Sequence, residues 1–169
     1  MNAEKIIHKW FWAWDFEREE QWLNTMAHTG WLLDSVGFCT YRFIPCPAEE
    51  YTVRMEMHAW DEDYLRFMEE TGAEYLGRMA TWIYFRKKTS DGVFDLFSDM
   101  DSRIGHLNRI GKLLAAVGVA NLLIGLANTL SSAWNLGWIN LLVATVLMYG
   151  LGRIHGKKEA LQAKRLLWE

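Results

Sequence analysis

Aromatic rings alternate with charged side chains along three segments that the sequence predicts to be strands. Successive side chains of a strand point to opposite faces of its sheet, so every second residue lies on the same face. Taking alternate residues of the three segments gives one set of side chains on the face away from the helices. That set is Trp10, Trp12, Trp14, Arg54, Glu56, His58, Trp60, Trp82 and Tyr84. An aromatic ring over a cation contributes about 0.5–2 kcal/mol. With Glu56 as the counter-charge, the pattern predicts a binding face for an amphipathic cation.

Two other interpretations of this face stay open. A second copy of the sheet, or residues 93–97, covers the rings as ordinary core. Alternatively the rings stack on RNA bases, as on other four-stranded sheets. Residues 1–112 hold 13 Lys and Arg against 19 Asp and Glu, a net charge of −6. This charge argues against direct nucleic-acid binding.

Catalytic motifs are missing from the sequence. The five histidines show no metal-binding spacing, and no nucleophile elbow, phosphate-binding glycine loop or dinucleotide fingerprint occurs. The acidic cluster around Asp15 is explained by helix capping. Cys39 and Cys46 match neither a redox nor a zinc pair. We expect a protein that is not an enzyme and that uses no cofactor or metal.

The elements that must position these residues follow from local patterns. Strands are predicted at 6–14, 38–44, 51–60 and 79–86, and helices follow Asp15 and Asp61 as N-caps, ending near Gly30 and Gly72. The order β-α-β-β-α-β predicts an α+β, ferredoxin-like domain over residues 1–88. Residues 89–112 are then a linker, with a strand or lid at 93–97, and a juxtamembrane helix from Asp99.

Residues 113–152 contain no Asp, Glu, Lys, Arg or His. The segment Ser131–Asn135, with Trp134, divides this run into Leu113–Leu130 and Leu136–Gly152, eighteen and seventeen residues long. At about 1.5 Å per residue, each half is close to the ~30 Å of a hydrocarbon core. We therefore predict a two-helix transmembrane hairpin over 113–152; the alternative is a buried helical hairpin in a soluble protein.

Basic residues flank the hairpin on both sides and are missing from its turn. They are Arg103, Arg109, Lys112, Arg153, Lys157 and Lys158. This distribution predicts a cell-membrane protein with two spans and with both termini in the cytoplasm. Residues 153–169 carry a net charge of +3, and Ile154, Leu161 and Trp168 recur every seven residues. The expectation is a basic amphipathic helix on the lipid surface, with a frayed polar tail as the alternative.

Small and amide residues repeat along the first span. The repeat consists of Gly111, Gly118, Gly125, Asn121 and Asn128, and Asn140 is a candidate partner in the second span. Small residues let helix backbones approach and amides bond across helices. This helix-packing seam serves either contacts within the hairpin or pairing of two protomers in a homo-oligomer.

The N-terminal segment Lys9–Ala27, followed by Gly30-Trp31-Leu32-Leu33, Tyr41-Arg42-Phe43 and Tyr51–Arg54, resembles the domain of unknown function 2812 family. Members of that family look like cytoplasmic domains followed by hydrophobic spans, often encoded beside PadR-type transcriptional repressors in Gram-positive bacteria. The resemblance implies a regulatory or envelope-stress role and supplies no catalytic residues.

These observations together favour a membrane-anchored cytoplasmic sensor or adaptor. Its expected partners are membrane lipid and either a ligand or a PadR-type repressor, whose basic DNA-binding surface the acidic domain would engage. The alternative is a small accessory subunit of a membrane transporter that docks through the seam.

Overall fold

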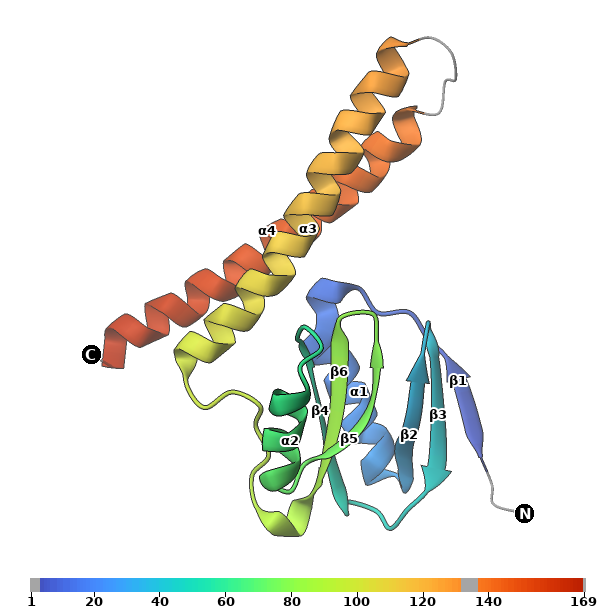
Figure 1. Ribbon diagram of the computed structural model, residues 1–169, viewed down its shortest axis with the longest axis vertical. Coiled ribbons are helices and arrows are strands. Elements are labelled where there is room, and N and C mark those ends of the chain that lie inside the picture. The colour runs from blue at the N-terminus through green and yellow to red at the C-terminus, as the bar shows by residue number, and fades with distance from the viewer. Residues whose placement is uncertain (1–3, 132–136, 169) are drawn as a thin grey trace. The chain divides into compact units, whose positions relative to one another are not determined.

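The chain divides into two compact units, Met1–Ser98 and Asp99–Glu169. A computed structural model describes residues 4–131 and 137–168 (Figure 1). The first unit is α+β, and the second consists of two long helices. This confirms the α+β class and the pair of long apolar helices.

The described part of the first unit, residues 4–98, contains six strands, two α-helices and two 3-10 turns. In chain order these are β1 (Lys5–His8), η1 (Ala13–Asp15), α1 (Phe16–His28), β2 (Trp31–Gly37), β3 (Thr40–Pro45), β4 (Tyr51–Met57), α2 (Glu62–Glu70), β5 (Glu74–Met79), β6 (Trp82–Lys88) and η2 (Thr89–Asp91). The strands form two three-stranded antiparallel sheets, ordered β1-β3-β2 and β4-β6-β5. We call these the first and second sheet.

The two halves of the unit repeat one plan. Each half runs β-α-β-β, and in each sheet the last strand pairs with both others. Gly30 and Gly72, which end the two helices at φ 85° and 84°, are 42 residues apart (72 minus 30). The same spacing relates the bulges at Leu33/Ser35 and Tyr75/Gly77. The sheets adjoin along β2 and β5 (Figure 1). At this junction Val36 lies against Gly77.

The ferredoxin-like order expected from the sequence is not confirmed, because β2 and β5 add two strands. Each of them is bulged, which interrupts the period-two alternation by which strands are recognised. Each then enters a two-residue turn with a non-glycine residue at positive φ, Cys39 at 51° and Ala80 at 54°. These turns lack the Asn-Gly and Asp-Gly signals of hairpins.

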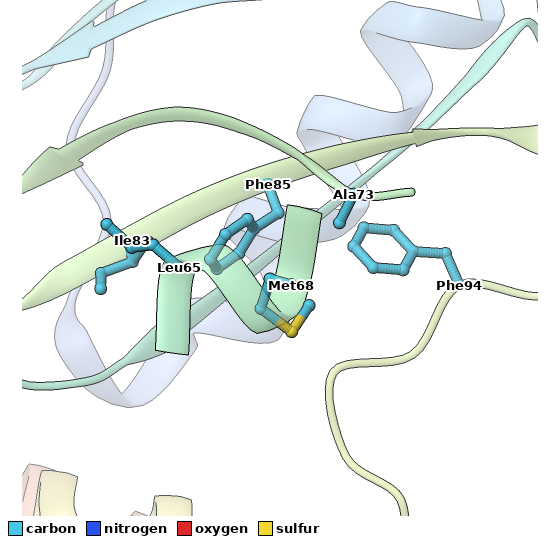
Figure 2. Close-up of a cluster of buried hydrophobic side chains, with 6 residues drawn as sticks. All are labelled: Leu65, Met68, Ala73, Ile83, Phe85 and Phe94. Atoms are coloured by element: carbon cyan, nitrogen blue, oxygen red, sulfur yellow. The ribbon is translucent and has the colours of Figure 1, made fainter. Parts of the chain in front are cut away.

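One hydrophobic cluster lies between α2 and the second sheet (Figure 2). Leu65 and Met68 of α2 pack on Ile83 and Phe85 of β6, with Ala73 beside them. Phe94 completes the cluster from an irregular segment. Residues 93–97 therefore lie as a lid on this side of the unit and form no strand.

The two helix starts differ in their capping. Asp61 accepts hydrogen bonds from the backbone N–H groups of Asp63 and Tyr64, as expected of an N-cap. Asp15 makes no capping bond with its side chain, because α1 follows directly on the 3-10 turn η1. The predicted helix at Phe16–His28 is confirmed, but its predicted cap is not.

The second unit consists of α3 (Met100–Leu130) and α4 (Gly137–Trp168). Asp99 and Ser102 form a reciprocal capping box, so the helix from Asp99 continues into the apolar run as predicted. Hydrogen bonds from the Ser102 backbone N–H and side chain hold the pKa of Asp99 below its usual value. By length and composition, both helices are able to cross a membrane.

Residues 153–168 continue α4 rather than forming a separate helix, and Ile154 is buried against Gly111 of α3. Arg165 contacts Asp101 of α3 at 2.7 Å. The separate surface helix expected for 153–169 is therefore replaced by a continuous helix that packs on α3. Trp134 and the rest of 132–136 lie outside the described residues, as does the Trp168 side chain.

Candidate functional site

Strand register separates the residues that were expected on one face of the sheet. In the β4–β6 ladder Glu56 lies opposite Ile83, whereas Tyr84 lies opposite Met55. Directly opposite residues share a face, so Arg54 and Glu56 lie on the α2 side and Trp82 and Tyr84 on the other. The prediction that these residues share a single aromatic face is therefore wrong. The error is equivalent to a one-residue slip between β4 and β6, which exchanges the two faces.

On the α2 side, Glu56 is buried and accepts a hydrogen bond from the Tyr64 hydroxyl. His58 stacks on the same Tyr64 ring with 4.2 Å between centroids. Trp60 lies beyond the end of β4, is exposed, and carries the Arg78 guanidinium over its ring at 4.9 Å. Glu56 therefore bonds α2 to β4, on the opposite face of the sheet from Trp82.

Trp10, Trp12 and Trp14 belong to the connection between β1 and α1, not to a strand. Trp12 stacks on the buried Trp14 with 4.8 Å between centroids, and Trp10 meets Trp12 edge-on at 5.3 Å. Phe38, from the β2–β3 turn, lies 6.0 Å from Trp10. Trp10, Trp12 and Phe38 are 53%, 42% and 75% exposed, and we call these three residues the aromatic array. Three adjacent exposed rings are typical of an interaction surface.

A buried carboxylate that the sequence analysis missed joins three elements of the unit. Glu19 of α1 is 5% exposed, and its Oε1 accepts hydrogen bonds from the hydroxyls of Tyr41 at 2.8 Å and Tyr84 at 2.7 Å. Tyr41 is in the central strand of the first sheet and Tyr84 in that of the second. Glu19 thus connects α1 to both sheets, and we call this triad the Glu19 node.

The electrostatics of the Glu19 node are governed by burial. Desolvation raises the pKa of Glu19 above its usual value, although the two tyrosine hydrogen bonds oppose that rise. Burial, together with the Glu19 charge, also raises the pKa of Tyr41 and Tyr84, so both phenols stay protonated donors. The signal for this node was available, since Glu19 falls on the same helical stripe as the buried Phe16, Leu23 and Ala27.

Helix α1 also covers the free edge of β4. The Asn24 side chain donates to the Val53 carbonyl and accepts from the Val53 N–H, both at 2.9 Å. Glu20 accepts from the Met55 N–H and pairs with Arg54 at 3.2 Å. Burial raises the pKa of Glu20, with the Arg54 charge opposing it. These side chains supply the backbone partners that an edge strand otherwise lacks.

An open cleft of about 420 Å³ lies along this edge. It is lined by Glu20, Gln21, Asn24, Thr25, His28, Thr52 and Arg54. Both signs of charge and two amides, Gln21 and Asn24, line it, so it fits a polar group rather than the hydrophobic cation that the tryptophans suggested. Among the described residues no group of three metal-ligating side chains occurs.

In the second unit, the three glycines of the helix-packing seam face α4. A Cβ placed on Gly111, Gly118 or Gly125 would lie within 3.6 Å of Leu151, Met148 or Leu141, respectively. Asn121 donates to the Val117 carbonyl of its own helix at 2.8 Å. The structure therefore brings the glycines to one intramolecular interface, whereas the Asn121 amide bonds within α3. Asn128 and Asn140 are half-buried.

The family model for proteins of unknown function described as DUF2812 matches residues 15–119. The chain belongs to this family. The match includes the Glu19 node, the β4 edge cleft and the first part of α3, so the family region crosses from the first unit into the helical one. Trp10 and Trp12 precede the matched region. Searches of curated protein sequences and of solved structures give no match.

Proposed function

We propose that this DUF2812 member is a membrane-anchored sensor or adaptor. Its first unit binds a regulatory partner on the cytoplasmic side, and α3 and α4 anchor it in the membrane with both termini in the cytoplasm. The observation that carries the proposal is the exposed aromatic array on a domain whose chain continues into two long apolar helices.

The burial of the helices supports the membrane anchor. Only 22% of the most apolar window of each helix is buried, although mean hydropathy reaches 1.9 in α3 and 1.3 in α4. Leucine and isoleucine side chains such as Leu123, Ile124 and Leu142 point outward. A hairpin in the core of a soluble protein would cover these side chains, whereas a bilayer leaves them in hydrocarbon.

The charge and position of the array support a protein partner over a small cation. Glu56 lies on the α2 side and bonds to Tyr64, so the array does not contain the carboxylate that the cation hypothesis assigned to it. Residues 1–112 are acidic, with 13 basic against 19 acidic residues. A partner with a basic surface and an apolar contact point fits both features, and a PadR-type repressor offers such a basic DNA-binding surface.

The proposal is tested by pull-down of a PadR-type repressor with the full chain in nanodiscs, at low and high salt. We expect capture at low salt that weakens as salt rises, because the attraction is between opposite charges. Trp10→Leu with Trp12→Leu should abolish capture, while Trp60→Leu, which changes an exposed tryptophan outside the array, should not. Capture that does not depend on the salt concentration, or no capture at all, counts against the proposal.

Small cations are tested on the same sample. Titration with tetraphenylphosphonium should leave the tryptophan fluorescence unchanged if the array binds a protein. A saturable shift that disappears in the Trp10→Leu, Trp12→Leu variant would instead favour a cation sensor. The transporter-subunit alternative is less well supported, because the glycines through which it would dock already pack against α4.

A further inference from the structure

A groove of about 240 Å³ lies between α3 and α4, at the end of the hairpin where charged residues begin. Asn108 and Lys112 line it from α3, and His155 and Lys158 line it from α4. Residues three or four apart share a helix face, so these four side chains converge from two neighbouring faces. The remaining lining is apolar and consists of Leu107, Gly111, Ala115, Leu151 and Ile154.

The level of the groove along the helices matters for its chemistry. Lys112 immediately precedes the uncharged run, and Lys158 follows the end of that run by six residues (158 minus 152). If α3 and α4 span the membrane as proposed above, this level is that of the lipid phosphates. Two lysines and an amide above an apolar floor match a molecule with an anionic head and a hydrocarbon tail.

From this position and chemistry we infer that the groove binds the headgroup of an anionic phospholipid. The ammonium groups of Lys112 and Lys158 contact the phosphate, and the Asn108 amide is placed to donate to it. Gly111 and Leu151 border the apolar side of the groove, on which the upper part of an acyl chain would lie. His155 is oriented by Glu159 of the next turn, at 3.3 Å, and so borders the site. The inference rests on the membrane placement in the proposed function.

Native mass spectrometry of the full chain tests the site, after reconstitution in phosphatidylcholine with and without phosphatidylglycerol. We expect the protein to retain phosphatidylglycerol. Retention should fall about tenfold in Lys112→Gln with Lys158→Gln, since each basic residue near an anionic surface adds to the attraction for anionic lipid. Arg153→Gln with Lys157→Gln removes equal charge from the same level of α4 but outside the groove lining. That control should lose much less lipid.

Further variants separate a site from loss of folding and from diffuse attraction. Lys112→Arg with Lys158→Arg keeps both charges and should keep the lipid. Gly111→Leu fills the groove without changing charge and should lose it. Equal loss in the groove and control pairs would overturn the inference, because it would indicate only general attraction of basic residues to the membrane. Displacement of the lipid by inorganic phosphate would also overturn it and assign the groove to a soluble anion.

The outcomes distinguish this inference from the proposed function. A chain that inserts in membranes and captures a repressor but retains no phosphatidylglycerol leaves the sensor intact and removes the lipid site. A chain that retains the lipid but captures no partner supports the lipid site and contradicts the proposed sensor function.

Discussion

The two units of the chain differ in which residues they leave exposed. In the first unit, large rings and aliphatic chains such as Tyr84 and Phe85 are buried, and carboxylates are buried only with partners, as at Glu19 and Glu56. In the second unit, Ile110 and Leu114 are buried, but many other leucines are exposed and glycines make close contacts. Water drives apolar side chains inward, whereas hydrocarbon gives no such drive and leaves close packing to join helices. The proposed membrane anchor would account for this contrast, because it places each unit in a different solvent.

The largest expected effect comes from breaking the close packing of the second unit. Gly125→Leu places a Cβ 2.8 Å from Leu141 Cδ2 and 3.1 Å from the Gly137 carbonyl, so α3 and α4 must separate. We expect a loss of about 1–3 kcal/mol, typical of overpacking. Unfolding of the purified chain in mixed detergent micelles measures it. Gly152→Leu is the matched control, since a Cβ there meets nothing within 4 Å; equal effects of the two variants would contradict close glycine packing.

The Glu19 node gives an effect of comparable size, now in the first unit. Tyr84→Phe removes one of the two hydroxyls that Glu19 accepts from, and hydrogen bonds to charged groups contribute about 1.5–3 kcal/mol. We expect a loss of that order in the free energy of unfolding, followed by tryptophan fluorescence in urea.

A double-mutant cycle with Tyr41→Phe provides the control for the node. Both hydroxyls donate to the same Oε1, so the two losses should not add. Strict additivity would indicate that the two tyrosines act independently.

Stability of the first unit should depend on pH in an unusual direction. Burial raises the pKa of Glu19 and Glu20, so folding favours their protonated forms. Their contribution to the free energy of unfolding is complete below the ordinary carboxyl pKa. It is lost as the pH rises through the raised pKa values. We expect the free energy of unfolding to fall from about pH 4.5 towards neutrality, and Glu19→Gln to reduce that fall. The exposed Glu70→Gln is the control, and a slope that Glu19→Gln leaves unchanged would contradict the assignment.

The smallest effect concerns the ends of the helical unit. Arg165 and Asp101 pair at 2.7 Å but are 45% and 68% exposed, so water screens their attraction. Asp101→Asn should change stability by less than about 1 kcal/mol, as is usual for surface pairs. A large loss in thermal unfolding would show that this end of the hairpin is held by the ion pair rather than by packing around Ile154.

The sequence predicted features that depend on local pattern. Phe16–His28, the Asp61 cap and the helix from Asp99 follow from capping and periodicity, and the glycine spacing of α3 predicted one packing seam. Features that depend on pairing were predicted wrongly. The faces of Glu56 and Tyr84 are set by the β4–β6 register, which period-two reading of separate strands does not contain.

The candidate site shows the same difference between features set by local pattern and features set by contacts between distant segments. Tryptophans at positions 10, 12 and 14 alternate as in a strand, yet β1 ends at His8 and the rings stack in a connection. The Glu19 node needs three elements that are far apart in the chain, so no spacing reveals the two tyrosines. In the sequence, only the position of Glu19 on the apolar stripe of its helix indicated that it is buried. Acidic residues are common at helix starts, and this preference offered a simpler explanation for Glu19.

Membrane extraction of the intact chain tests the central claim most directly. We predict that the protein stays in the membrane fraction after alkaline carbonate treatment and needs detergent to become monodisperse. A full-length chain that is water-soluble and monodisperse without detergent would contradict the contrast between the two units and the anchor built on it.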